Sequence, residues 1–204
     1  MSYFCRVLAI FSCCLQLWGC QRPSGAHPTV QTAAPLPSAS IYYLESRWSD
    51  QNGAEMQLRS LRGKPQVIAM IYGSCKGACP RILEELRRVE RMLSERSSQE
   101  AGFVLITMDP EVDSSQRLRE LAEKYALGSR WRLLRGSEED TRELAAALGV
   151  KYKKISNTDY AHSNTITVLS SAGLVVHQKQ ELGGVEASAH ALEEAVANKD
   201  LCCP

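Results

Sequence analysis

The order of apolar and polar residues predicts alternating strands and helices between residues 41 and 199. Two continuous apolar runs, at 63–73 and 102–109, are typical of strands buried on both faces. Apolar residues at three- and four-residue intervals predict amphipathic helices after each run. The alternation predicts an α/β fold with a mixed sheet covered on both faces. In chain order we expect a hairpin (41–61, turning at "DQNGA"), a strand (63–73), a helix (80–95), a strand (102–109), a helix (113–128), a strand (131–136), a helix (137–150), a hairpin (165–182) and a helix (184–199).

Local signals set the predicted ends of two helices. Pro80 suits the first helical position and disfavours helical geometry in the residue before it, so Cys79 is the predicted N-cap. Asp113 and Gln116 form a predicted capping pair for the helix at 113–128, and Gly128 is its predicted stop.

The first twenty residues resemble an export signal. Arg6 precedes an apolar stretch at 7–18, which is too short to span a bilayer and matches the apolar part of a signal peptide. "LWGC", which ends at Cys20, resembles the lipobox of a bacterial lipoprotein, and the resemblance implies a diacylglycerol on the Cys20 sulfur. An ordinary secreted or membrane-retained start is the alternative. We expect an exported, lipid-anchored protein in the periplasm or on the outer face of a bacterial membrane.

Composition supports one globular domain with flexible flanks. The 204 residues are 44% apolar and 23% charged with a net charge of +1, which excludes general disorder and gives no sign of nucleic-acid binding. Pro, Ser and Ala dominate residues 21–40, a composition typical of a tether. The predicted organisation is a signal peptide at 1–19, a tether at 20–40, the domain at 41–198 and a tail at 199–204.

Only two of the eight cysteines, Cys75 and Cys79, lie within the predicted domain. They stand in "YGSCKGACP", where a buried strand ends and a helix begins, and the positive end of a helix dipole favours thiolate over thiol. Such a pair can form a disulfide or bind a soft metal such as Cu(I). A purely structural disulfide is less favoured, because closing so short a loop gains little.

The histidines offer one candidate third ligand. His27 lies in the tether, His177 in a predicted strand and His190 in a predicted helix, and none of these positions indicates a site. His162 lies in "DYAHSNTITV", just before a strand, and a mixed sheet can bring it beside the cysteine loop. Spacing alone leaves an ordinary loop histidine as the alternative.

Three segments in order resemble the Sco/SenC family of thioredoxin-fold copper proteins, associated with cytochrome c oxidase assembly. They are "GKPQVIAMIYGSCKGACP", "ITMDPEVDS" and "YAHSNTITVLSSAG", and the resemblance runs from about Ile41 to about Ala197. It implies a thioredoxin-like fold with an N-terminal β-hairpin and one copper ion on Cys75, Cys79 and His162. It also implies a role for Asp109 beside these ligands, although Asp-Pro is equally a good turn former. The implied function is a metallochaperone that gives copper to the dinuclear copper site of the oxidase's copper-bearing subunit.

The chain departs from the family at two loop positions. Lys76 and Gly77 stand where the family commonly has proline and an acidic residue, which puts the stiffness and charge of the loop in doubt, not the ligands. Cys202 and Cys203 form a vicinal pair near the C-terminus, which bridges poorly, and accessory thiol chemistry or copper binding is the candidate use for them.

Two enzyme activities are the alternatives to a chaperone. A thiol–disulfide oxidoreductase would use Cys75 and Cys79 as a redox-active disulfide to reduce a partner's cysteines, and it needs no third ligand. A peroxidase related to peroxiredoxins is not favoured, because that family has threonine three residues before its reactive cysteine. Tyr72 and Lys76 occupy those positions here.

Overall fold

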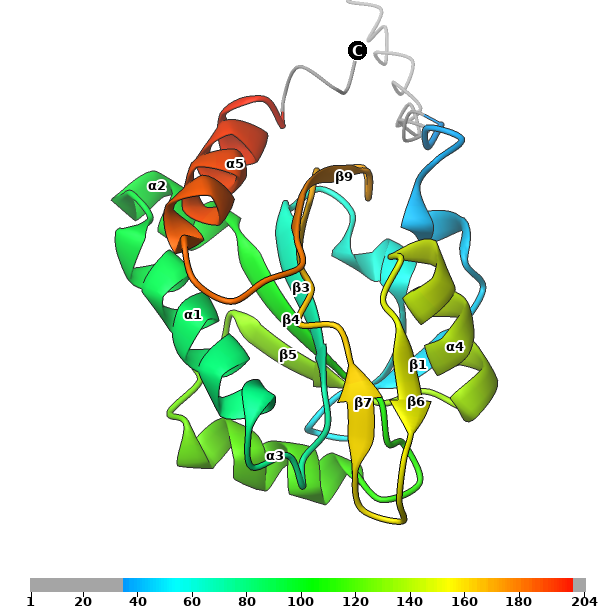
Figure 1. Cartoon of the computed structure of the whole chain (residues 1–204). Coiled ribbons are helices and arrows are strands. Elements are labelled where there is room, and N and C mark those ends of the chain that lie inside the picture. Colours follow the sequence, from blue (N-terminus) through cyan, green and yellow to red (C-terminus); the bar gives the residue numbers. More distant parts are fainter. Residues whose placement is uncertain (1–34, 200–204) are drawn as a thin grey trace, which may run out of the picture. The chain divides into compact units, whose positions relative to one another are not determined.

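A computed structural model describes residues 35–199 of the chain (Figure 1). The predicted signal peptide, most of the predicted tether and Cys20, Cys202 and Cys203 therefore lie outside the described residues. Within the described part, no helix is long and apolar enough to cross a membrane.

The core of the domain is a five-stranded mixed sheet with the order β5-β4-β3-β8-β9. The first three of these strands are parallel, whereas β8 runs antiparallel to β3, and β9 antiparallel to β8. Every residue of β3 and β4 is buried, as their continuous apolar runs predict. The predicted mixed sheet is confirmed; its strands are β3 (Gln66–Ile71), β4 (Gly102–Thr107), β5 (Trp131–Leu134), β8 (Ile166–Leu169) and β9 (Val175–Lys179).

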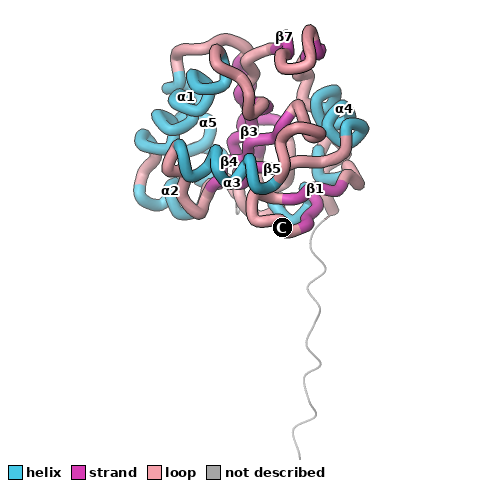
Figure 2. Tube along the Cα trace, turned by 90° about the horizontal axis from the view of Figure 1, so that it is seen from below, coloured by secondary structure: helices cyan, strands magenta, loops and turns pink. Residues whose placement is uncertain are grey.

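Helices cover both faces of this sheet. α1 (Ala78–Met92) and α5 (Val185–Ala197) contact each other and the sheet on one side, and α4 (Glu138–Ala147) lies on the other (Figures 1 and 2). α3 (Ser115–Lys124) contacts β5, and the short α2 (Glu95–Glu100) contacts α5. The prediction of a sheet between helices is therefore correct.

Two small hairpins stand outside the main sheet. The predicted N-terminal hairpin is present as β1 (Arg47–Ser49) and β2 (Glu55–Gln57), between the short 3₁₀ helices η1 (Ile41–Tyr43) and η2 (Leu58–Leu61). The second hairpin, β6 (Tyr152–Lys154) and β7 (Tyr160–His162), was not predicted. Figure 1 shows it beside the lower end of β3, where the cysteine loop begins.

Three predicted helix boundaries are wrong. Gly77, not Cys79, caps α1, because proline fits the first helical turn without requiring that its predecessor lie outside the helix. Ser114, not Asp113, caps α3 by accepting the Arg117 N–H, and Asp113 turns into the core instead. α3 also stops before Gly128, since Ala126 takes the left-handed conformation with a φ of 48°.

Candidate metal centre

The cysteine loop leaves the carboxyl end of β3 and enters α1 within seven residues, 72–78. Its N-cap, Gly77, has no side chain to accept a hydrogen bond from the helix. The sulfur of Cys75 takes that place by accepting the backbone N–H of Cys79, with an N···Sγ distance of 3.3 Å. The free N–H groups of a helix start stabilise negative charge, so this position favours a thiolate on Cys75.

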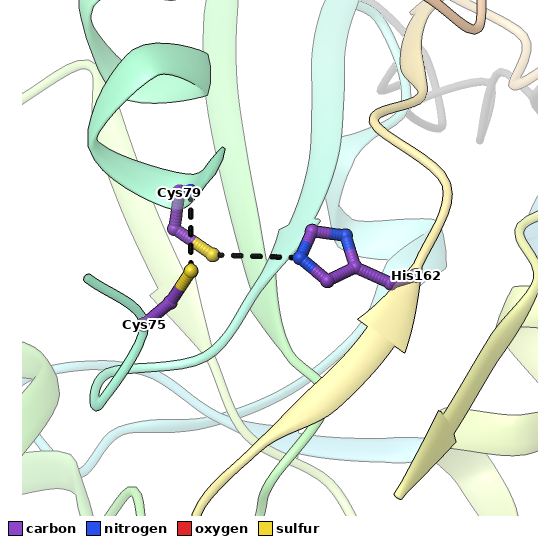
Figure 3. A group of neighbouring side chains, drawn as sticks. All are labelled: Cys75, Cys79 and His162. Atoms are coloured by element: carbon purple, nitrogen blue, oxygen red, sulfur yellow. Dashed lines mark hydrogen bonds between the residues drawn. The ribbon is translucent and has the colours of Figure 1, made fainter. Parts of the chain in front are cut away.

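His162 reaches the same place from the end of β7 (Figure 3). Its Nε2 lies 3.9 Å from the Cys79 sulfur, and the Nε2 atom and both sulfurs all lie within 4.8 Å of one another. The Nδ1 atom of His162 is 3.1 Å from the Ser163 carbonyl oxygen. A carbonyl can only accept, so Nδ1 is the donor in this contact, and in the neutral ring the lone pair is on Nε2, the nitrogen that faces the sulfurs.

The two thiols have opposite electrostatic environments. Burial raises the pKa of the half-buried Cys75, but hydrogen bonds to its sulfur, chiefly from Cys79 and Gly77, outweigh burial and hold the pKa below its usual value. Burial also raises the pKa of Cys79, which is 3% exposed, and there the raising effect wins, helped by the nearby charges of Cys75 and Asp113. Both cysteines are free thiols. The loop therefore holds one half-buried thiol with a lowered pKa and one buried thiol with a raised pKa.

Aromatic side chains form the wall behind the three residues. The Tyr72 ring lies edge-on to the His162 ring with centroids 5.7 Å apart, and it contacts the Tyr160 ring at 5.2 Å. The Tyr72 hydroxyl donates to the Asp159 carboxylate, and Ser74 donates to the Thr158 carbonyl at 3.1 Å. These two bonds join the β6–β7 hairpin to the cysteine loop. Sequence reasoning missed both tyrosines, although each lies within three residues of a predicted ligand.

The two aspartates after β4 lie near the site without joining the ligand cluster. Asp109 is buried and accepts the Tyr160 hydroxyl at 3.1 Å, with Lys154 Nζ at 3.9 Å, so it supports the aromatic wall. Asp113 accepts the Gly73 backbone N–H at 2.8 Å and the Thr107 hydroxyl, so it holds the start of the cysteine loop. Burial raises the pKa of the Asp113 carboxyl, and these hydrogen bonds only partly offset it.

The chemistry of the three donors suits a soft metal. Two sulfurs and one imidazole nitrogen match Cu(I) better than Mg²⁺ or Ca²⁺, which take oxygen ligands. Among residues 35–199, this trio is the only group of histidine, cysteine or acidic side chains with such spacing. The Nδ1 atom of His190 lies 3.6 Å from a carboxylate oxygen of Glu194 on α5. His177 lies on β9 and is not part of the trio.

Comparison with known proteins places this geometry in a family. The SCO1/SenC family model matches residues 44–197. A Stutzerimonas stutzeri protein named for copper binding is 29% identical over 128 residues, which are 61% of this chain and 62% of that protein. A SCO1 homologue of Bacillus subtilis is 24% identical over 143 residues, covering 68% and 72% of the two chains.

Solved structures agree in fold. The copper-bound ScoI of Arabidopsis thaliana superposes with a TM-score of 0.63 at 20% identity, covering 77% of this chain and 96% of that one. Copper-bound yeast Sco1 gives a TM-score of 0.64 at 20% identity, covering 74% and 86%. The predicted thioredoxin-like fold is confirmed by these likenesses. With the family model spanning nearly the whole described domain, this chain belongs to the SCO1/SenC family.

Proposed function

We propose that the protein is an extracytoplasmic copper metallochaperone that binds one copper ion with Cys75, Cys79 and His162. It delivers the ion to the dinuclear copper site of cytochrome c oxidase. The observation that carries the proposal is the convergence of two sulfurs and one free imidazole nitrogen within 4.8 Å. Membership of a family with copper-bound structures supports it.

Each residue has a distinct part in holding the cargo. Cys75 supplies a thiolate stabilised by the start of α1, and Cys79 supplies a second sulfur that gives up its proton on binding. His162 supplies Nε2, with its ring fixed through the Ser163 carbonyl. Three ligands are few enough that an acceptor can add its own ligand before the chaperone releases the ion.

The test is copper binding by the reduced protein with and without His162. We expect one copper per chain, and a copper affinity reduced by about tenfold or more in His162→Ala, which removes a ligand outright. The matched control is His190→Ala, because His190 is exposed on α5 and contacts Glu194 rather than the site. Equal affinities in both variants would rule out the three-ligand site.

Export and anchoring complete the proposed role. A lipid on Cys20 would hold the protein at a membrane on the oxidising side of the cell, where the copper-bearing subunit of the oxidase is its proposed partner. Transfer of copper from the loaded protein to the isolated copper-bearing domain of such a subunit, with no free copper present, tests the delivery step. No net transfer to that domain would restrict the role to storage or to another acceptor.

A thiol–disulfide oxidoreductase remains the second candidate, favoured by the contrast between the thiols. Cys75, which is half-buried and has the lowered pKa, would attack a partner's disulfide as the thiolate, form a mixed disulfide and release one partner thiolate. Cys79, once deprotonated, would displace the second partner thiolate and close the Cys75–Cys79 disulfide, so two electrons pass to the partner. His162→Ala should leave this reaction intact while it lowers the copper affinity, and this difference separates the two functions.

A further inference from the structure

A pocket beside the metal centre opens on the side away from His162. Its volume is about 470 Å³, and both Cys75 and Cys79 line it, together with apolar side chains of α1 and α3. These include Leu83 of α1 and Leu121 of α3, and the ring of Tyr125, the residue after α3, lines the pocket as well. His162 is not among the lining residues; Figure 3 shows it reaching the sulfurs from the β7 side, opposite α1. The sulfurs can therefore be reached without passing the histidine.

The rim of this pocket is positively charged. Lys76 and Lys124 line it, both are exposed, and no acidic residue lines it. Lys124 Nζ lies 5.4 Å from the centre of the Tyr125 ring. A neighbouring hollow along α3, which Lys124 also lines, adds the exposed Arg117 and Glu120 and the buried Asp113. Three cationic side chains, those of Lys76, Lys124 and Arg117, therefore stand against two carboxyls on this face, and the excess is positive.

Taking the proposed function as its premise, we propose that the α1–α3 pocket is the route by which the copper acceptor reaches the metal. The occupant we infer is an acidic acceptor segment that carries a soft ligand and an apolar side chain. Its carboxylates face Lys76 and Lys124, its apolar side chain fills the space beside Leu121, and its ligand approaches the sulfurs.

The transfer step is a ligand exchange without oxidation or reduction. The acceptor's ligand forms a new bond to Cu(I), one bond from copper to a cysteine sulfur breaks, and the released thiolate takes a proton from water. His162 keeps its bond during this first exchange, because the acceptor enters from the other side. Opposite charge on the rim raises the local concentration of acidic acceptors and speeds their approach.

The experiment follows removal of Cu(I) from the full-length reduced protein by two chelators. Bathocuproine disulfonate is anionic and neocuproine is uncharged. We expect Lys124→Glu to slow removal by the anionic chelator by about three- to tenfold at low salt, with the effect shrinking as salt screens the rim. Removal by neocuproine should be unchanged. Leu121→Trp fills the pocket and should slow both chelators.

The matched control is Lys153→Glu, which makes the same charge change on an exposed residue of β6 that does not line the pocket. It should leave both rates near those of the parent. The route is overturned if Lys124→Glu and Lys153→Glu slow copper removal equally. It is also overturned if neither Lys124→Glu nor Leu121→Trp slows copper removal. Copper affinity is measured in parallel. A parent protein that binds no copper would refute the proposed function. A parent that binds copper, with variants whose rates of copper removal equal those of the parent, would refute the route alone.

Discussion

Asp113 shows how one buried carboxyl fixes the start of the cysteine loop. One of its oxygens accepts both the Gly73 N–H and the Thr107 hydroxyl, which ties the end of β3 to the end of β4. A Cβ at position 73 would lie 2.5 Å from the other oxygen, so the approach requires glycine. The sequence predicts a cap here because aspartate and serine are equally good N-caps, and only packing decides that Ser114 takes the role.

The raised pKa of Asp113 predicts a pH-dependent effect on stability. A carboxyl whose pKa is higher in the folded state than in the unfolded state stabilises the fold while protonated, and loses that contribution as pH rises. Asp113→Asn should therefore gain stability relative to the parent as pH rises above about 4, the pKa of an unfolded aspartate, and through the raised folded-state pKa. Urea unfolding of both proteins across this range measures the difference, and a constant difference would contradict the prediction.

Glu193 gives a control of opposite sign. Burial raises its pKa, but hydrogen bonds from Ser97 and Ser94 hold the pKa below the usual value. Its contribution is therefore present at neutral pH and is lost as pH falls through the lowered pKa. Glu193→Gln should lose stability relative to the parent as pH rises over the acid range, opposite to the trend for Asp113→Asn.

At the scale of elements, the sequence predicts the helices and strands whose pattern of apolar and polar residues is long or regular. β3 and β4 follow from continuous apolar runs, and the capped helix α4 follows from Ser137 and the acidic residues after it. The β6–β7 hairpin was not predicted, because its strands have three residues each and its segment is mostly polar. Its stability comes from contacts with distant residues, which no local pattern records.

The bond between Tyr72 and Asp159 should control the mobility of that hairpin. Tyr72→Phe keeps the buried ring but removes the hydroxyl that donates to Asp159. We expect the hairpin's backbone amides to exchange with solvent several-fold faster, corresponding to about 1 kcal/mol of local stability. Tyr43→Phe is the control, because the Tyr43 hydroxyl donates to the Leu36 carbonyl and makes no bond to the hairpin. Hydrogen exchange that is equally slow in the parent and in Tyr72→Phe would show that Ser74 and the aromatic contacts suffice.

At the scale of the whole molecule, the candidate site could be predicted only in part. The pairing of Cys75 with Cys79 is local in the sequence, whereas the position of His162 depends on how the whole sheet folds and came from the family resemblance. Tyr72 and Tyr160 could not be chosen among seven tyrosines, because only the folded chain brings their rings together.

Membrane attachment is the prediction that concerns the chain as a whole. Cys20 lies outside the described residues and is the only residue through which the proposed lipid is attached. Cys20→Ser should abolish labelling by a radioactive fatty acid and leave the precursor uncleaved, since the sulfur is the site of acylation. Labelling and gel mobility of both proteins in the producing bacterium measure this. A Cys20→Ser protein that still takes up label would disprove the lipobox.

The separation of 83 positions between Cys79 and His162 in the sequence links copper binding to the lifetime of the protein. An unfolded chain keeps its two thiols close together but has no fixed distance to the imidazole, so copper held by all three binds the native state preferentially. By mass action, free copper at 100 times its Kd then stabilises the native state by at most about 2.7 kcal/mol, and binding of copper to the two thiols of the unfolded chain lowers this figure. The copper-bound protein therefore resists unfolding and proteolysis. The copper-free protein unfolds more readily and is degraded faster. Turnover of this protein in the cell would thus follow its copper supply.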